Sequence, residues 1–296
     1  MANARRELPG AARLVLDIED RPGPPQLRFE ATGNGRLTAI RQGERPVLLG
    51  ALTGDGCCHD LHLHRLDGYR SPLPPIESAR MRSEVNWVHQ YARWLEASGQ
   101  GPWYDGRWEL SPRTVFEPAV WTADFVRDWP GGLLELYCGG GWHGILPLRR
   151  LCEPDAARVK AYRKHVRDGT LAPVLLWWAP SLDGWLILDG HDRAVAALAE
   201  GRTPPCVVLT RLRDEELWRR DAEEMTEGHR RRMERLAARP ATPGTERQRA
   251  AMEQGYGRAL ADLPYEPSGI RTWPLPGGAP AWRALARAAM FQFPGD

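Results

Sequence analysis

Lysine is almost absent from this chain of 296 residues: Lys160 and Lys164 are the only two among 40 basic side chains. Basic and acidic side chains nearly cancel, which leaves a formal net charge of +2. A protein that binds nucleic acid through a globally basic surface needs a larger excess of positive charge. The charge balance therefore argues against nucleic acid as the partner.

Cysteine and long hydrophobic runs are also scarce. Five cysteines, an odd number spread through a long chain, do not build a disulfide framework. No apolar run approaches the ~20 residues that span a bilayer, so we expect no membrane partner. Residues 1–6 are polar and basic with no hydrophobic segment behind them, so no signal peptide is expected. These features predict a cytoplasmic protein.

The stretch with the most potential chemistry follows Leu188. An apolar strand over residues 185–188 is followed directly by a box of five residues: Asp189, Gly190, His191, Asp192 and Arg193. A helix of small residues begins at once. This layout directs several backbone N–H groups, a helix N-terminus and an arginine toward one point, which is what a phosphate group requires. The sequence therefore predicts an anion-binding loop here.

The pattern around the box is regular. Short apolar runs predict strands over residues 144–148, 173–178, 185–188 and 205–209, and apolar spacing predicts helices over residues 154–168 and after residue 190. This order and spacing resemble the ParB/sulfiredoxin superfamily over residues 144–213. In that superfamily the box binds the phosphates of a nucleotide. The resemblance therefore implies that all five box residues bind ATP or another nucleotide.

The box sequence separates the branches of that superfamily. Sulfiredoxins carry a cysteine where this chain has His191, which argues against sulfinic acid reduction. Chromosome-partitioning proteins carry a different box and a helix-turn-helix domain, which the residues after Asp214 do not show. The free-serine kinases, with Asp-Gly-His-His-Arg, are the closest match, and Asp192 replaces the second histidine. The resemblance thus implies phosphoryl transfer to a small hydroxylated acceptor, or NTP hydrolysis.

Each box residue has a functional and a structural interpretation. Asp189 could act in catalysis with Mg²⁺ or a substrate hydroxyl, or it could cap the helix. Gly190 lets a phosphate approach closely. His191 could donate a hydrogen bond to a phosphate oxygen as a catalytic group, or it could be a packed histidine. Arg193 offers a planar fork suited to phosphate, or it could form an ion pair.

Asp192 is the unexpected member, because a carboxylate repels phosphates. The repulsion is avoided if a divalent ion lies between them or if the side chain turns away. Asp189 and Asp192 together could hold Mg²⁺, which would then bridge the phosphates. If no metal ion binds, Asp192 indicates that nucleotide affinity has been lost. The sequence thus predicts a Mg²⁺ site with this alternative left open.

Phosphoryl transfer also needs a group that orients or deprotonates the acceptor hydroxyl. In the free-serine-kinase branch a glutamate just after the first strand has this role, and the resemblance places Glu153 there. The competing interpretation is an ordinary helix start, with an acid before Pro154. Glu153 is therefore a candidate catalytic residue with a structural alternative.

Two further stretches contain residues of chemical interest. Residues 57–64 hold two cysteines and three histidines, which suggests zinc, but a second half-site is missing. The glycines at 139–141 have no Lys-Ser/Thr partner and do not form a P-loop. Neither stretch is the preferred site.

The chain as a whole predicts an α+β fold, with hydrophobic residues at 42%. We expect a β-rich N-terminal domain at residues 1–75, in which residues 11–52 form a β meander. A Trp-rich connecting region at 76–143, a ParB/sulfiredoxin-like domain at 144–213 and a helical extension at 214–296 follow.

The preferred function is nucleotide binding with phosphoryl transfer or NTP hydrolysis. With that activity the protein would be a Mg²⁺-dependent kinase or NTPase. The first alternative is a non-catalytic, nucleotide-dependent or degenerate scaffold for a protein partner. The second is a DNA-associated ParB relative or nuclease, against which the near-neutral charge argues.

Overall fold

The computed structural model describes residues 2–8, 12–21, 23–54, 59–116, 120–121, 131–136, 144–182 and 184–293. The chain divides into two compact units. Unit 1 comprises residues 1–210 and 269–296, and unit 2 comprises residues 211–268. Helices and mixed sheets are both present, which is compatible with the predicted α+β class.

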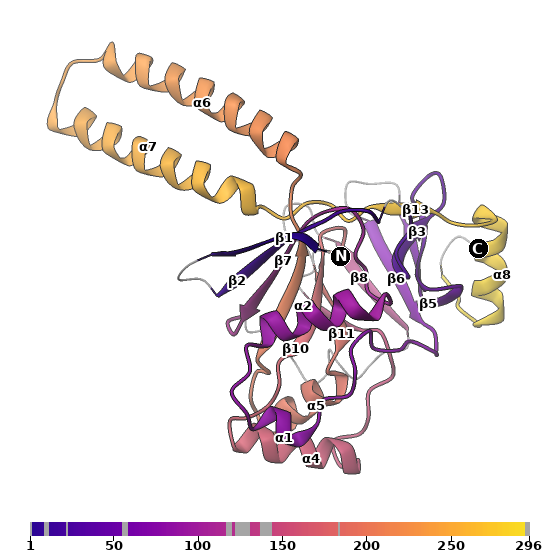
Figure 1. Ribbon diagram of the computed structural model, residues 1–296. Coiled ribbons are helices and arrows are strands. Elements are labelled where there is room, and N and C mark those ends of the chain that lie inside the picture. Colours follow the sequence, from indigo (N-terminus) through magenta and orange to yellow (C-terminus); the bar gives the residue numbers. More distant parts are fainter. Residues whose placement is uncertain are drawn as a thin grey trace. The chain divides into compact units, whose positions relative to one another are not determined.

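The first sheet of unit 1 has seven strands (Figure 1). They are β1 (Ala2–Leu8), β2 (Arg13–Ile18), β7 (Gly106–Arg113), β9 (Ile145–Pro147), β10 (Val174–Ala179), β11 (Gly184–Asp189) and β12 (Cys206–Arg211), in the spatial order β1-β2-β7-β12-β10-β11-β9. Strand β10 is antiparallel to β11 and parallel to β12, and β11 is parallel to β9. Strand β11, which ends at the first residue of the box, thus lies between two other strands, β10 and β9.

The second sheet has six strands and a mostly antiparallel order. They are β3 (Leu27–Ala31), β4 (Leu37–Gln42), β5 (Arg45–Thr53), β6 (His59–Arg65), β8 (Gly131–Leu136) and β13 (Thr272–Pro274), in the order β13-β3-β4-β5-β6-β8. Only β13, next to β3, pairs in parallel among these strands. Strands β3 to β6 therefore form a continuous meander.

Alternation along the strands builds the core between the two sheets. In β10, Leu175 and Trp177 belong to the large apolar cluster that also contains Phe29, while Val174 and Leu176 belong to a second cluster. The rings of Phe29 and Trp177 lie 5.2 Å apart. Both faces of β10 are thus buried, which is why its sequence is an unbroken apolar run rather than an alternating one.

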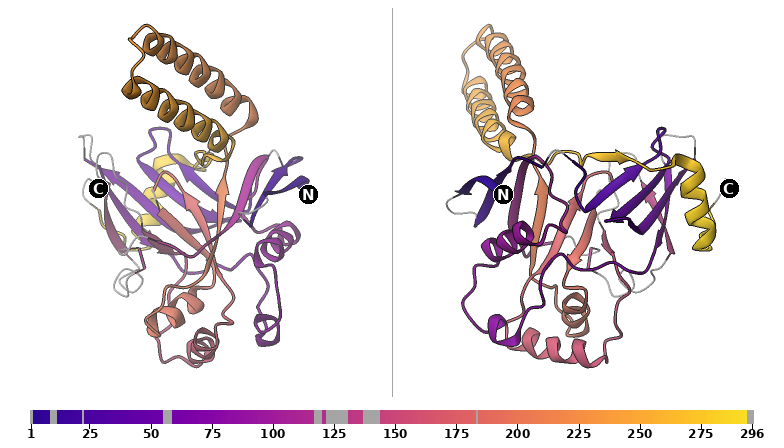
Figure 2. Two further views of the ribbon diagram at one scale, coloured as in Figure 1. Left: turned by 90° about the vertical axis from the view of Figure 1, so that its left-hand side faces the viewer. Right: turned by 45° about the vertical axis from the view of Figure 1, so that its right-hand side comes forward.

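Five described helices complete unit 1. They are α1 (Ser78–Met81), α2 (Trp87–Ser98), α4 (Ala157–Arg167), α5 (His191–Ala199) and α8 (Gly278–Ala288). Helices α4 and α5 lie together at one end of the seven-stranded sheet (Figures 1 and 2). Helix α8 packs on the six-stranded sheet, where the buried indole of Trp282 donates a hydrogen bond to the Thr38 carbonyl at 2.7 Å. Among the helices described, none is both long and apolar enough to cross a bilayer.

Unit 2 is a helical hairpin. It consists of α6 (Glu215–Ala237), α7 (Pro243–Asp262) and a 3₁₀ turn at Leu263–Tyr265. Thr242 and Thr245 form a capping box at the start of α7, where a proline occupies the first turn. The segments that enter and leave the unit pair through an isolated β-bridge between Leu212 and Pro267.

The arrangement differs from the expected domain division. Strand β2 does not join the predicted meander of residues 11–52 but pairs with β1 and β7 in the other sheet, so that part of the prediction is wrong. The boundaries expected at residues 75 and 143 do not separate the sheets, because β1, β2 and β7 share a sheet with β9 to β12. The predicted extension 214–296 is also divided, since β13 and α8 return to unit 1. Strand pairing across long sequence separations produced each difference.

The contact between Phe29 and Trp177 gives a stability prediction. Replacing the fully buried Trp177 by alanine leaves a cavity between the sheets, and the free energy of unfolding should fall by about 3–5 kcal/mol. Urea unfolding followed by circular dichroism measures the change. Trp178→Ala, which alters the half-buried neighbour on the other face of β10, is the matched control and should cost clearly less. Equal losses would contradict the assignment of the core.

Candidate functional site

The site is built where β11 ends and α5 begins. Gly190 lies between them in a left-handed conformation, with φ of +93°. The amide of Ala194 donates the first helical bond to the Gly190 carbonyl at 2.8 Å. The amides of the first turn therefore precede the helical ladder, and no side chain caps them. The sequence predicted a helix N-terminus here, and the alternative in which Asp189 caps the helix is not observed.

A cavity of about 250 Å³ opens at this turn. The residues that line it are Arg70, Ser71, Arg149, Arg158, Tyr162, Asp189, Gly190, His191, Asp192 and Arg193. All five box residues thus share one cavity wall. The contacts of their side chains, described below, differ from one box residue to the next.

The side chain of Arg193 forms its hydrogen bonds with other groups of the protein. Its side chain is buried, and its Nη2 atom donates to Asp189 Oδ2 at 2.7 Å, to the Pro173 carbonyl at 2.8 Å and to Tyr91 Oη at 3.3 Å. These bonds tie α5 to the end of β11, to the residue before β10 and to α2. The ion-pair alternative for Arg193 is the geometry that the structure shows, although its Nε atom has no partner among the described residues.

His191 is held as a neutral ring. The Leu148 amide donates to its Nε2 atom at 3.1 Å, so that nitrogen is the acceptor and the proton lies on Nδ1. Burial, together with Arg149, Arg65 and Arg193, lowers the pKa of His191 well below 6.5. The ring therefore adds no positive charge to the cavity. Its contact with Leu148 ties the start of α5 to the chain after β9.

Asp192 holds two arginines. Its Oδ2 atom lies 2.8 Å from Arg149 Nη2 and 3.3 Å from Arg158 Nε. The Asp192 side chain is buried, whereas those of Arg149 and Arg158 are partly and largely exposed. The carboxylate therefore anchors the two guanidinium groups in the cavity wall and leaves their outer surfaces open. Its repulsion of an anion is offset by the two charges it positions.

The thiol of Cys152 lies beside this ion cluster. Burial and the nearby Asp192 carboxylate raise the pKa of Cys152, so the thiol stays protonated at neutral pH. A protonated thiol is a poor nucleophile. The environment of Cys152 therefore favours a structural contact over a sulfiredoxin-like reaction.

The segment at residues 69–71 contributes Arg70 and Ser71 to the cavity wall. Tyr69 is buried and its hydroxyl donates to the Leu188 carbonyl at 2.8 Å, which fixes this segment against the end of β11. Burial, with the Asp189 charge, raises the pKa of Tyr69 well above 10, so its hydroxyl remains a donor. The contact brings the exposed Arg70 and Ser71 to the cavity.

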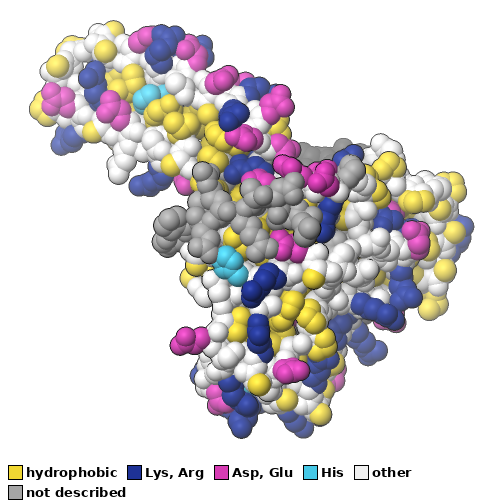
Figure 3. Space-filling model, in the orientation of Figure 1, with side chains coloured by type: hydrophobic (Ala, Val, Ile, Leu, Met, Phe, Trp, Pro, Cys, Tyr) yellow, Lys and Arg dark blue, Asp and Glu magenta, His cyan; other side chains and the backbone are white. Residues whose placement is uncertain are grey.

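The charges in the cavity wall are predominantly positive. Its lining contains the guanidinium groups of Arg70, Arg149, Arg158 and Arg193, but only the two carboxylates of Asp189 and Asp192. Further basic side chains gather on the part of unit 1 that carries α4 (Figure 3). An anion that enters the cavity meets this positive excess and the positive end of the α5 dipole.

Other predicted residues lie elsewhere. Glu153 is exposed and is not among the lining residues, although its carbonyl accepts a bond from the Ala156 amide as in a helix start. Residues 57–58 and 139–141 lie outside the described part of the chain, within which no group of three or more potential metal ligands occurs.

The sequence analysis missed the residues that supply most of the accessible positive charge. Arg149 lies two residues after the end of β9, and a basic residue there was a local signal that could have been used. Arg158 lies in the first turns of α4. Arg70 was not recognisable, because only the long-range contact of Tyr69 with Leu188 brings it to the box.

Gly190 gives a prediction about the turn. A Cβ atom at Gly190 would lie 2.7 Å from Arg193 Nη2, and its φ value disfavours other residues. Gly190→Ala should therefore lower the free energy of unfolding by about 2–4 kcal/mol, from backbone strain and from displacement of the buried guanidinium. Gly201→Ala is the matched control, since Gly201 also has positive φ but open space around it. Urea unfolding compares the two, and an equal loss in both would contradict a specific clash with Arg193.

His191 gives a prediction about pH. Its pKa is lowered in the folded protein, so the unfolded chain binds the proton first as the pH falls below about 6.5. The stabilisation from a neutral His191 is complete above that pH and is lost progressively below it. His191→Gln, which keeps an acceptor and does not titrate, should reduce the loss of stability between pH 7 and 5. Urea unfolding at each pH measures the slopes, and identical slopes would mean that His191 is not held neutral.

Comparisons with protein-family models, with curated proteins and with solved structures find no match for this chain. The resemblance of residues 144–213 to the ParB/sulfiredoxin superfamily therefore stays a prediction from the sequence. The case for a function depends on the cavity itself, whose charge and uncapped helix N-terminus favour an anionic ligand.

Proposed function

We propose that unit 1 binds the phosphate groups of ATP or another nucleotide in the cavity at the start of α5. The observation that carries this proposal is the excess of guanidinium over carboxylate groups in the cavity wall, next to an uncapped helix N-terminus. Phosphate carries charge and several acceptor oxygens, so it makes use of both features. This part of the chain is then a ParB/sulfiredoxin-like domain, and we place the protein in the cytoplasm.

In this proposal, groups on four segments of the chain bind the phosphates. Arg149 and Arg158, held by Asp192, bind phosphate oxygens with the outer edges of their guanidinium groups. Arg70 and the first-turn amides of α5 supply further donors to the phosphates. Asp192 and Arg193 are positioning residues in this proposal, because both are already paired with protein groups.

Phosphoryl transfer to a small hydroxylated acceptor, or NTP hydrolysis, is the catalytic form of the proposal. It would use Glu153, Asp189 and His191, of which Glu153 lies outside the cavity wall. Mg²⁺ at Asp189 and Asp192 does not fit as a directly bound ion, since Asp189 Oδ2 is 2.7 Å from Arg193 Nη2, Asp192 Oδ2 is 2.8 Å from Arg149 Nη2, and the unpaired Asp192 Oδ1 is buried. No step here is therefore derived through a metal ion.

A second candidate is a nucleotide-dependent scaffold for a protein partner. The same pairing favours it: both carboxylates in the cavity wall hold arginines through Oδ2, and the remaining Oδ1 of Asp192 is buried, which disfavours both as general bases. Such a protein would bind the nucleotide without turnover. DNA association has less support, because the net charge of the chain is only +2.

Titration calorimetry with pyrophosphate and ATP, with and without Mg²⁺, tests the proposal. Arg158→Ala should weaken the binding of pyrophosphate by about tenfold or more, because a charge-assisted hydrogen bond contributes ~1.5–3 kcal/mol. Arg149→Ala should do the same, with some loss of stability because Asp192 then loses a partner. Arg247→Ala on α7, an exposed arginine in unit 2, is the matched control and should bind normally. Absence of heat with both ligands on the unmodified protein would end the proposal.

A further inference from the structure

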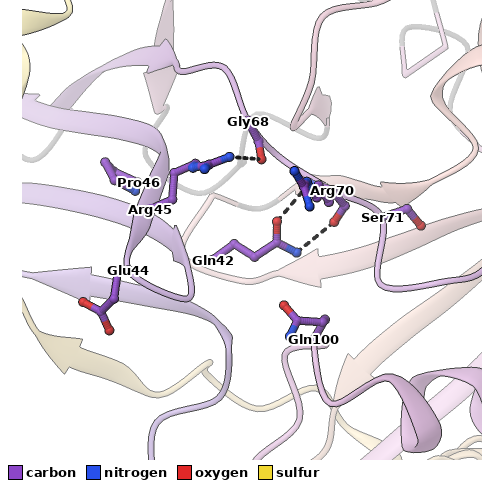
Figure 4. A pocket seen from close by; sticks show the side chains of 8 residues that line it. All are labelled: Gln42, Glu44, Arg45, Pro46, Gly68, Arg70, Ser71 and Gln100. Atoms are coloured by element: carbon purple, nitrogen blue, oxygen red, sulfur yellow. Dashed lines mark hydrogen bonds between the residues drawn. The ribbon is translucent and has the colours of Figure 1, made fainter.

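A second, larger cavity adjoins the first in unit 1. Its volume is about 790 Å³, and its lining residues are Gln42, Glu44, Arg45, Pro46, Gly68, Arg70, Ser71 and Gln100 (Figure 4). Arg70 and Ser71 line both cavities, so the two form adjoining parts of one surface. A ligand anchored in the small cavity can therefore extend past Arg70 into the larger one.

The shared segment is fixed from both sides. On one side Tyr69 donates to the Leu188 carbonyl. On the other, Gln42 Nε2 donates to the Arg70 carbonyl at 2.8 Å, and the Arg70 amide donates to Gln42 Oε1 at 2.9 Å (Figure 4). Two hydrogen bonds to the Gln42 side chain therefore hold the backbone of Arg70. The guanidinium of Arg70 remains available to a ligand.

The small cavity is too small for a whole nucleotide. Pockets that enclose a ligand of drug size measure roughly 300–1,000 Å³, whereas this one is about 250 Å³. It accommodates the phosphate groups, and the remainder of the molecule has to lie outside it. The larger cavity is the neighbouring space with polar groups to receive that remainder.

The lining of the larger cavity is suited to hydroxyl groups. Gln42 and Gln100 present carboxamides, and Glu44 and Arg45 present a carboxylate and a guanidinium. The side chain of Gln100 makes no hydrogen bond with the part of the chain that the structure describes, so its donors and acceptor are open. Groups that both donate and accept match the hydroxyls of a sugar.

Neither cavity offers an aromatic face for a base. No aromatic side chain is among the described residues that line the larger cavity. In the small one, the buried ring of Tyr162 has the Arg158 guanidinium over it, 5.8 Å from the ring centre. Stacking on an aromatic ring contributes ~1–3 kcal/mol per base in proteins that hold bases in this way. That contribution is missing here.

We infer that the larger cavity is a subsite for the sugar of a ribosyl polyphosphate and that the site does not discriminate between bases. This inference rests on the proposed function, since the phosphates must first occupy the small cavity. The ligand class is then a nucleotide recognised through its phosphates and its ribose hydroxyls. Gln100 is the residue of the larger cavity best placed to reveal the contact, because its side chain is exposed and has no structural partner among the described residues.

Titration calorimetry with tripolyphosphate, ATP, CTP and GTP tests the inference. The three nucleotides should bind with affinities within about threefold of one another and about tenfold tighter than tripolyphosphate, from two or more hydroxyl hydrogen bonds. Gln100→Ala should weaken the binding of each nucleotide by about fivefold, toward the affinity of tripolyphosphate. The affinity of tripolyphosphate itself should not change. Gln248→Ala on α7, an exposed glutamine of unit 2, is the matched control and should change none of the four affinities.

The outcomes separate the two proposals. If tripolyphosphate does not bind the unmodified protein, the phosphate site itself is wrong. If tripolyphosphate binds but the nucleotides gain nothing over it, or Gln100→Ala leaves their advantage intact, the sugar subsite is wrong and the phosphate site stands. A preference of more than tenfold for one base would overturn the absence of base recognition. Circular dichroism of each variant establishes that it is folded before the titration.

Discussion

The geometry of the cavity depends on one buried guanidinium group. Arg193 binds three oxygens that come from different parts of the chain: the Asp189 carboxylate, the Pro173 carbonyl and the Tyr91 hydroxyl. A buried charge that loses one of its partners costs several kcal/mol, so these contacts constrain one another strongly. Their effect is to hold the first turn of α5 in place relative to β11 and α2. The amides of that turn can then face a ligand without a capping side chain, because other bonds keep the turn ordered.

The same principle explains an acidic residue in a site proposed for anions. Asp192 carries the sign of charge that a phosphate carries, and it is buried in the cavity wall. Its carboxylate is shared by Arg149 and Arg158, whose side chains reach the surface. Flexible arginines lose side-chain entropy when they bind, and a partner that orients them in advance reduces that loss. A residue that looks unfavourable in the sequence thus contributes through the two cations it arranges.

Local patterns in the sequence predicted the elements better than their pairing. The unbroken apolar runs at β10, β11 and β12 and the Asp-Gly turn were recognisable, because burial on both faces and a left-handed residue leave direct marks in the sequence. The pairing of β2 with β7 and the contact of Arg193 with Tyr91 join residues that are far apart in the chain. No local period encodes such contacts. For the same reason the box and an ion pair of its arginine could be predicted, but the contacts of Arg193 with Tyr91 and Pro173 could not.

The bridge between Leu212 and Pro267 has a consequence for the architecture of the chain. These two residues flank the α6–α7 hairpin, and the backbone leaves β12 and returns toward β13 through this one paired stem. No strand of either sheet is interrupted by the hairpin, since β12 ends at Arg211 and β13 begins at Thr272. The hairpin can therefore be lengthened, shortened or exchanged where the chain passes Leu212 and Pro267. The order of the strands in both sheets stays the same.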